Sequence, residues 1–334
     1  MTMIQIKITE NEENQRLDRF LKKYLRNAPL SYIYKLIRKG VKVNGKRVSP
    51  QTQLTLGDEI TLFLNEEEID SYLSNEKNLS AKKQFRIVYE DNNLLIVDKP
   101  FGLLVHGTEQ EKKNTLANQV ITYLIEQGTY QPTREKVFVP SPVNRLDRNT
   151  TGLVIFGKNY ESLKSLNQML RERGFIRKYY LTIVKGELKK ELHLVDRMEK
   201  DKPTNKIMVL NQDTDKGKVM ETVARPLCSV GGYTLVEVEI ITGRTHQIRA
   251  HMAKAGYPVI GDEKYGDHQV NQRMKRRFSL TTQFLHAHRL FFSRAMAPHE
   301  NMIGKEIKCP LPSNLEHICK VLFEGESING TKER

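Results

Sequence analysis

The chain of 334 residues has few cysteines and no long apolar run. Cys228, Cys309 and Cys319 lie far apart and form no CxxC pair, so they indicate neither a disulfide framework nor a zinc site. No apolar stretch approaches the ~18 residues that a membrane-spanning helix needs. The first residues, MTMIQIKITENEENQ, lack the apolar segment of a secretion signal. These absences predict a cytoplasmic protein without membrane association.

Motifs for a bound cofactor or metal are also missing. The chain has no GxGxxG loop for a dinucleotide. The segment from Gly152 to Lys158 has the spacing of a P-loop, but Asn159 stands where serine or threonine is needed and the intervening LVIF is a strand pattern. No metal-ligand spacing such as HExxH joins His246, His251, His286 and His288. The sequence therefore predicts chemistry without a metal or a cofactor.

Acidic residues are almost absent from residues 16–47, which contain eleven Lys and Arg but a single acid, Asp18. The whole chain has 54 Lys and Arg against 40 Asp and Glu, a net charge of +14. A basic excess concentrated on one short segment favours a polyanionic partner, and nucleic acid is the usual one. The alternative is a charged face that only keeps the protein in solution.

The basic segment has the pattern of two short helices. Apolar residues recur at helical spacing over residues 17–25, and the basic residues fall between them on the opposite face. Pro29 ends this helix, and Ser31 is a good N-cap for a second one. Gly40 is placed to end the second helix.

Short strands follow the two helices. An Asn-Gly turn predicts a hairpin over residues 41–48, and LTLGDEITLFL (54–64) predicts two strands around a Gly-Asp turn. This order resembles the alpha-L RNA-binding module found in a small-subunit ribosomal protein, tyrosyl-tRNA synthetases and many RNA-modifying enzymes. The resemblance implies that Asp18 is a structural acid at a helix start. It also implies RNA contacts by Arg16, Lys35, Arg38, Lys39, Lys42, Lys46 and Arg47.

The composition divides the chain into an RNA-binding domain over 13–64, a linker over 65–84 and a larger domain over 85–326. The linker, NEEEIDSYLSNEKNLSAKKQ, is acidic, polar and without periodicity. After it, strand-like runs outnumber helical patterns and follow one another like hairpins, which favours an α+β fold with a mixed or antiparallel sheet. The expected helices lie at 115–127, 160–173 and 245–255. The expected strands are FRIVYE, LLIVDKP, GLVIFGK, YYLTIVKG, YTLVEVEIITG and LHAHRLFF.

The tetrapeptide RLDR occurs twice, around Asp18 and around Asp147. The second copy lies in SPVNRLDRNTTGLVIFGKN, where prolines and the Asn-Thr-Thr-Gly stretch exclude helix. Asp147 is therefore expected on a loop that feeds the strand 153–156, a common place for a catalytic group. The adjacent Arg145 and Arg148 would favour an ionised carboxylate. A loop-capping acid is the alternative reading.

This second segment resembles the signature of RluA/RluC-type pseudouridine synthases, V-H-R-L-D-x-x-T-S-G-L. Four further segments resemble that family in the same order: VDKPFGLLVHG (97–107), IRKYYLTIVKG (176–186), TGRTHQIRAHMAKAGYPVIGDEKYG (242–266) and LHAHRLFF (285–292). The likeness covers residues 15–325. One departure is Asn144 where the family has His, and another is Thr151 where it has Ser. Asn keeps donor and acceptor capacity, so we expect a hydrogen-bonding role at position 144.

The resemblance implies a role for each matching residue. Asp147 matches the essential aspartate that lets uracil leave its ribose and reattach through C5. Tyr180 matches the tyrosine that packs on the uracil, and Arg249 matches the arginine that pairs with the aspartate. Arg145 matches an arginine that enters the RNA helix at the position from which the target nucleotide has flipped out. Further substrate-binding candidates from the matching motifs are Arg148, Lys99, His106, Arg244, His246 and Gln247.

The resemblance implies an RNA pseudouridine synthase, an isomerase that we expect to be a monomer and to act on large-subunit ribosomal RNA. A tRNA substrate is the second possibility. A non-enzymatic RNA-binding or ribosome-assembly factor with a decayed site is a third, and the presence of Asp147, Tyr180 and Arg249 argues against it. A nuclease or methyltransferase would need metal carboxylates or a cofactor loop that the sequence lacks.

Overall fold

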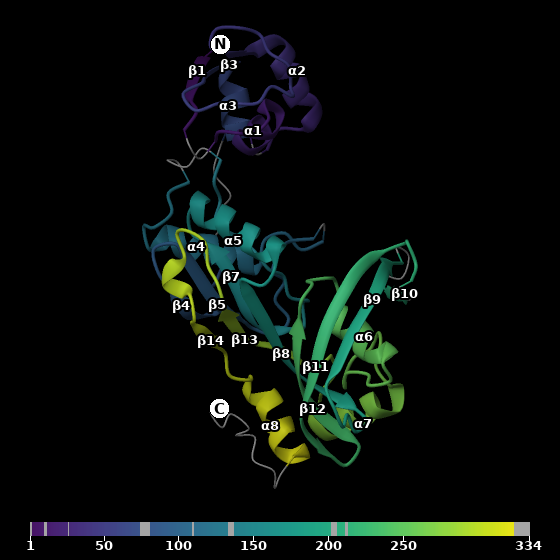
Figure 1. The fold of residues 1–334 in the computed structure, drawn as a ribbon. Helices are drawn as coiled ribbons and strands as arrows, with labels where there is room; N and C mark the ends of the chain where they lie inside the picture. Colours follow the sequence, from purple (N-terminus) through teal and green to yellow (C-terminus); the bar gives the residue numbers. More distant parts are fainter. Residues whose placement is uncertain are drawn as a thin grey trace. The chain divides into compact units, whose positions relative to one another are not determined.

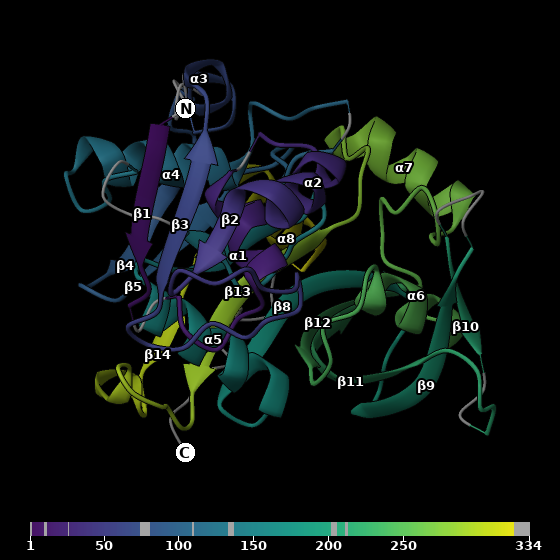
Figure 2. The same cartoon turned by 90° about the horizontal axis from the view of Figure 1, so that it is seen from above.

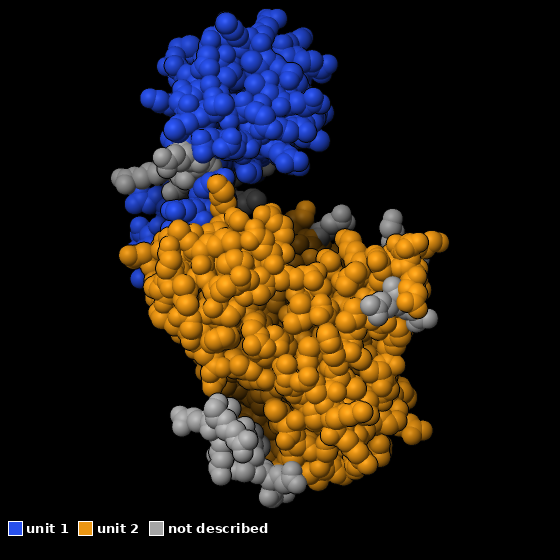
Figure 3. Space-filling model, viewed as in Figure 1, with its two compact units in different colours: residues 1–82, 118–140, 158–161 blue, residues 83–117, 141–157, 162–334 orange. Residues whose placement is uncertain are grey.

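The structure is a computed structural model that describes residues 2–9, 12–25, 27–73, 81–108, 110–132, 137–201, 206–210 and 213–323. The chain forms two compact units (Figure 1, Figure 3). Unit 1 comprises residues 1–82, 118–140 and 158–161, and unit 2 comprises 83–117, 141–157 and 162–334. None of the helices in the described ranges has the length and apolarity to cross a bilayer. The domain limits 13–64 and 85–326 stay predictions.

The N-terminal part of unit 1 packs two helices on a small sheet. Helices α1 (Leu17–Tyr24) and α2 (Leu30–Gly40) bury their apolar faces in one core with the strands. Figure 2 shows the three strands side by side in the order β1 (Thr2–Lys7), β3 (Glu59–Leu64) and β2 (Val41–Val43), all antiparallel. Both amphipathic helices are thus confirmed, whereas β1 was not predicted.

Two local predictions in this module need correction. The second helix starts one residue after Pro29, and Ser31 lies inside it, exposed and without a capping role. Proline fixes its own φ near the helical value but leaves the preceding backbone extended, so it can stand at a helix start. The Asn44-Gly45 turn forms, with φ of 50° and 75°, but only one bridge follows it, and β2 pairs with β3 instead.

The linker predicted for 65–84 contains a helix, α3 (Glu66–Leu73). Its start is a capping box, in which the Asn65 side chain accepts from the Glu68 amide at 2.7 Å and the Glu68 carboxylate accepts from the Asn65 amide at 2.9 Å. Three glutamates in the first turn complement the helix dipole. The N-x-x-E spacing was the sequence signal for this helix, and the acidic composition concealed it.

Unit 2 is built on an 11-stranded mixed sheet, as the α+β prediction required. The main path runs β10-β9-β11-β12-β8-β13-β7-β5-β4, with β14 on β13 and β6 on β7. The strands predicted from the sequence correspond to β4 (Arg86–Glu90), β5 (Leu94–Lys99), β7 (Thr151–Gly157), β8 (Ile176–Lys185), β12 (Tyr233–Ile240) and β13 (Leu285–Phe292). The strands not predicted are β6 (Ser141–Pro142), β9 (Leu192–Lys200), β10 (Ile207–Leu210), β11 (Lys218–Val230) and β14 (Glu306–Lys308).

The predicted helices are present as α4 (Leu116–Glu126), α5 (Tyr160–Glu172) and α6 (Gln247–Lys254). Two more, α7 (His268–Phe278) and α8 (Ser313–Leu322), were not predicted. Helix α7 is capped by Asp267, whose side chain accepts from the Val270 amide at 2.9 Å. Most residues of α7 are polar or basic, and its buried residues are two apolar ones, Val270 and Met274. Two residues are too few to form a clear apolar stripe at helical spacing.

Strand β13 joins the two halves of the sheet, because it lies between β8 and β7 (Figure 1). It pairs antiparallel with β8 and parallel with β7, where Ala287 lies opposite Gly152. Gly152 has a φ of +106°, and a Cβ built on it would lie 2.2 Å from the Ala287 carbonyl oxygen. The junction between the halves therefore requires glycine at this position.

We expect Gly152→Ala to lower the free energy of unfolding by more than about 3 kcal/mol, because the clash is with backbone atoms that cannot move aside. Gly231→Ala is the matched control, since Gly231 also has positive φ, +57°, but has no atom within 4 Å of the added carbon. Gly231→Ala should lower the free energy of unfolding by only ~1 kcal/mol. Urea unfolding of both variants measures the difference, and equal losses would contradict the steric explanation.

Candidate active site

A cavity of about 320 Å³ opens in unit 2 around Asp147. Its wall combines polar groups with apolar side chains, a mixture typical of a small-molecule or nucleotide pocket. The lining residues come from the loop before β7, from β8, from α5 and from the segment that starts α6. They include Asn144, Arg145, Leu146, Asp147, Leu170, Lys178, Tyr180, Arg244, His246, Ile248, Arg249 and Leu285.

Asp147 lies on the loop between β6 and β7, as predicted. Asn144 fixes the start of this loop on β7: its Oδ1 accepts from the Ile155 amide at 2.8 Å and its Nδ2 donates to the Leu153 carbonyl at 3.2 Å. The hydrogen-bonding role expected for Asn144 is confirmed. The amide of Thr150 donates to the Asp147 carbonyl at 3.1 Å and closes the turn behind the carboxylate.

Lys99 supports the same loop from the protein interior. Its side chain is fully buried, and Nζ donates to the carbonyls of Pro100, Leu103 and Arg148 at 2.8–2.9 Å. Burial lowers the pKa of Lys99 to about 7, while Asp147 opposes that shift. Three carbonyl acceptors use all three protons of an ammonium. Lys99 therefore positions the loop, and its role in substrate binding stays a prediction.

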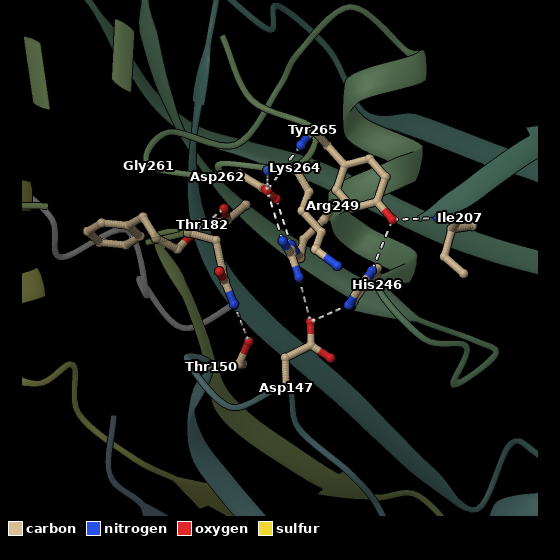
Figure 4. Close-up of polar contacts among 12 residues, drawn as sticks. Asp147, Thr150, Thr182, Ile207, His246, Arg249, Gly261, Asp262, Lys264 and Tyr265 are labelled. Carbon is tan, nitrogen blue, oxygen red and sulfur yellow. Dashed lines mark hydrogen bonds and ion pairs between the residues drawn. The ribbon is translucent and has the colours of Figure 1, made fainter. Parts of the chain in front are cut away.

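Arg249 connects Asp147 to a second carboxylate, Asp262. Its Nη1 donates to Asp147 Oδ2 at 3.0 Å, and its Nε and Nη2 donate to the two oxygens of Asp262 at 2.6 and 2.9 Å (Figure 4). The guanidinium is almost completely buried on α6, and Asp262 is fully buried. Burial alone would lower the pKa of Arg249, but Asp262 and Asp147 raise it overall. A permanent cation is therefore held against the Asp147 carboxylate.

Asp262 is held in turn by the backbone of its own loop. Its Oδ1 accepts from the amides of Lys264 and Tyr265 at 2.9 and 3.1 Å. The side chain of Asn271, in the first turn of α7, donates to the Asp262 carbonyl at 2.8 Å. The orientation of the Asp262 carboxylate is therefore fixed. Because Asp262 binds Nε and Nη2 of Arg249, the third nitrogen, Nη1, is directed at Asp147.

His246 lies beside this pair. Its Nε2 is 3.8 Å from Asp147 Oδ2, and its Nδ1 is 2.9 Å from the hydroxyl of Tyr265 (Figure 4). The Tyr265 hydroxyl also accepts from the Ile207 amide of β10 at 2.7 Å. His246 has a left-handed backbone, φ 52° and ψ 19°, at the N-cap of α6.

Tyr180 lies on β8 and lines the cavity, almost fully buried. Burial and the nearby Asp147 charge raise the pKa of Tyr180, so it is a neutral phenol at neutral pH. An aromatic ring beside the carboxylate can pack on a base that enters the cavity. A neutral phenol accepts a proton only if it loses its own.

The remaining predicted residues are placed differently. Arg145 is exposed and Arg244 half-buried, and both line the cavity. His106 is exposed but outside the lining residues. Arg148 forms an ion pair with Glu111 and not with Asp147. Gln247 lines the cavity, and its buried side chain bonds to Thr242, Arg244, Glu221 and Thr222, so its role in substrate binding stays a prediction.

The basic face of the N-terminal module is exposed, as predicted. Arg16 instead pairs with Asp18 at 2.6 Å, and the Arg19 amide donates to the same carboxylate at 2.8 Å. This confirms Asp18 as a structural acid in the first turn of α1. The other predicted RNA contacts of the module are exposed, and among the described residues none of them has a carboxylate partner: Lys35, Arg38, Lys39, Lys42, Lys46 and Arg47.

Two sequence-family models match the chain. Residues 93–254 match RNA pseudouridylate synthase, and residues 15–60 match the S4 domain. The ribosomal large subunit pseudouridine synthase C of Vibrio vulnificus (strain CMCP6) is 32% identical over 326 residues, which cover 96% of this chain and 97% of the relative. This chain belongs to the RNA pseudouridylate synthase family. The ribosomal large subunit pseudouridine synthase C of Escherichia coli (strain K12) is 32% identical to this synthase over 298 residues, 86% of this chain and 88% of the relative.

Solved structures agree on the fold of the synthase. The human protein titled RNA Pseudouridylate Synthase Domain Containing 4 superposes with a TM-score of 0.53 and 22% identity, covering 71% of this chain and 92% of that one. The human protein titled RNA Pseudouridylate Synthase Domain Containing 1 gives a TM-score of 0.51 and 21% identity, covering 69% of this chain and 84% of that one. These similarities concern the fold alone.

Sequence reasoning missed two residues of the synthase's site, Asp262 and Tyr265. Both lie in GDEKYG, a segment recognised as similar to the family, but no spacing rule brings Asp262 back to Arg249, 13 positions earlier. A buried arginine implies a buried carboxylate partner. The sequence therefore indicated that Arg249, if buried, needs a carboxylate partner. It did not indicate which acid is that partner.

We expect Asp262→Asn to lower kcat/KM by about 10²-fold, since Arg249 loses its bidentate partner and shifts from Asp147. It should also lower the free energy of unfolding by about 3–5 kcal/mol, because a buried charge loses its partner. Asp267→Asn, five positions later, is the control: asparagine is an equally good N-cap for α7. Steady-state kinetics and urea unfolding test both variants, and unchanged kinetics in Asp262→Asn would contradict the role of this carboxylate.

Proposed function

We propose that this synthase converts specific uridines of large-subunit ribosomal RNA to pseudouridine. The observation that carries the proposal is an aspartate on a rigid loop, paired with a buried arginine, beside an aromatic ring in a nucleotide-sized cavity. The choice of RNA rests on the names of the relatives that match over most of the chain. We further propose a monomer that works in the cytoplasm without a cofactor.

The reaction is an isomerisation, so it needs no redox partner. The N1–C1′ bond of uridine breaks, a C5–C1′ bond forms, C5 loses its proton and N1 gains one. Asp147 supplies the carboxylate that permits the detachment, and the buried Arg249 guanidinium holds its Oδ2 by a charged hydrogen bond. Tyr180 offers the face on which the detached uracil can rotate without leaving the cavity.

The target base must leave its stack before it reaches Asp147, at a cost of a few kcal/mol. Arg145 is exposed at the cavity rim and is the proposed side chain that enters the vacated position. The exposed cations of α2 and the following turn bind phosphates that hold the RNA. Transfer RNA is the alternative substrate, and the same site would serve it.

Asp147→Asn should abolish tritium release from RNA that carries C5-tritiated uridine, because the amide keeps the shape but not the charge. RNA affinity should stay within a few-fold, since phosphate contacts dominate binding. Asp18→Asn makes the same change in the other RLDR copy and should cost about 0.3–1 kcal/mol of stability with turnover intact. Turnover by Asp147→Asn would show that another group performs the reaction.

The triple variant Lys35→Gln, Arg38→Gln, Lys39→Gln should weaken RNA binding and reduce the salt slope of log K by about 0.7–0.9 for each phosphate that the protein no longer neutralises. The control removes three cations that each pair with a carboxylate, Lys185, Lys308 and Lys320. Filter binding from low to high salt compares the two. A salt slope unchanged in the first variant would exclude α2 from the RNA interface.

A further inference from the structure

The two oxygens of the Asp147 carboxylate have different surroundings. Oδ2 accepts from Arg249 at 3.0 Å and faces His246 Nε2 at 3.8 Å. Within the described residues Oδ1 has no hydrogen-bond partner, and Figure 4 shows it turned away from the Arg249 and His246 side chains. The side chain is only partly buried, 28% exposed, so Oδ1 is the oxygen that an entering nucleoside can reach.

The contacts of Tyr265 determine which nitrogen of His246 carries a proton. A backbone amide can only donate, so the Tyr265 oxygen accepts from Ile207. The phenol hydrogen then has one partner in the described part of the chain, His246 Nδ1 at 2.9 Å. If Nδ1 accepts this hydrogen, the proton of the neutral imidazole is on Nε2, the nitrogen that faces Asp147.

Backbone geometry and electrostatics support this arrangement. His246 holds a left-handed conformation, which costs a non-glycine residue of order 1 kcal/mol and is found mostly where the side chain is needed in one place. Burial lowers the pKa of His246, and although Asp147 opposes this, Arg249 and Lys264 add to it. The imidazole is therefore neutral at pH 7, and its Nε2–H is a donor without a charge.

We propose that His246 is a positioning residue that acts with Arg249 on Oδ2 of Asp147, so that Oδ1 is left as the reacting oxygen. Tyr265 sets the imidazole tautomer that this requires, and the Ile207 amide orients Tyr265. The Nε2–Oδ2 separation of 3.8 Å is longer than a hydrogen bond, and the proposal requires it to shorten when a nucleoside binds, as catalytic hydrogen bonds commonly do. The inference rests on the proposed function, because it names the atom that reacts.

Two substitutions of His246 separate positioning from a structural role. His246→Gln places an amide N–H at about the reach of Nε2, whereas the amide of His246→Asn is too short, although asparagine tolerates the left-handed backbone well. We expect the glutamine variant to keep kcat within about five-fold and the asparagine variant to lose about 10²-fold, the effect of ~1 Å of misplacement at a reacting group. KM and melting temperature should be similar in the two.

The tautomer is measured directly by ¹⁵N NMR of the imidazoles, with the His246 signal assigned by its loss in His246→Asn. The wild-type protein should show a protonated Nε2 and an unprotonated Nδ1 that accepts a hydrogen bond. Tyr265→Phe should give a mixture of tautomers and a kcat reduced about ten-fold, with RNA affinity unchanged. This spectrum needs no substrate, so it tests the arrangement even if the proposed function fails.

Each outcome decides one point. A proton on Nδ1 in the wild-type protein overturns the tautomer assignment, and equal kcat of the asparagine and glutamine variants overturns the positioning role. A loss of melting temperature that parallels the loss of kcat would assign His246 a structural role instead. Failure of the wild-type protein to release tritium from ribosomal RNA or transfer RNA would contradict the proposed function, and the NMR result would remain interpretable.

Discussion

The Arg249 guanidinium is the interaction on which the site depends. It is buried between two carboxylates, one fixed by backbone amides and one facing the cavity. A buried charge without a partner costs several kcal/mol of stability. Removal of Arg249 or of either carboxylate therefore leaves a charged side chain without its partner. The three groups come from α6, the loop before α7 and the loop before β7. The same electrostatic requirement therefore holds these segments together around Asp147.

The two RLDR copies show why a short motif does not determine a role. Around Asp18 the sequence neighbours are also the spatial neighbours, since Arg16 and the Arg19 amide bind the carboxylate within one helical turn. Around Asp147 neither adjacent arginine does so, and the partner comes from 102 positions away. The resemblance to the alpha-L module thus gave Asp18 its correct role, whereas local spacing named the wrong arginines for Asp147. The family resemblance identified Arg249, which spacing could not.

The same distinction separates the predictable part of the fold from the rest. Periodicity predicted α1, α2, α4, α5 and α6 and the six strands with continuous apolar runs, because burial imposes a pattern on each. It failed for β9 and β11, which mix charged and apolar residues, for β10, which has only four residues, and for α7, which buries only two apolar residues. The backbone contacts of Lys99 and Gln247 were not predicted, for a related reason. A polar residue inside a recognised motif can serve the backbone instead of the substrate, and only the three-dimensional contacts tell the two apart.

The position of β13 has a consequence for the synthesis of the protein. Asp147 belongs to the half of the sheet that contains β7, and Arg249 to the half that contains β8 and β12, whereas β13 enters between them late in the chain. Until residues 285–292 have left the ribosome, the edges of β7 and β8 that pair with β13 have no partner strand. The junction between the half that carries Asp147 and the half that carries Arg249 is therefore completed only after most of the chain has been synthesised.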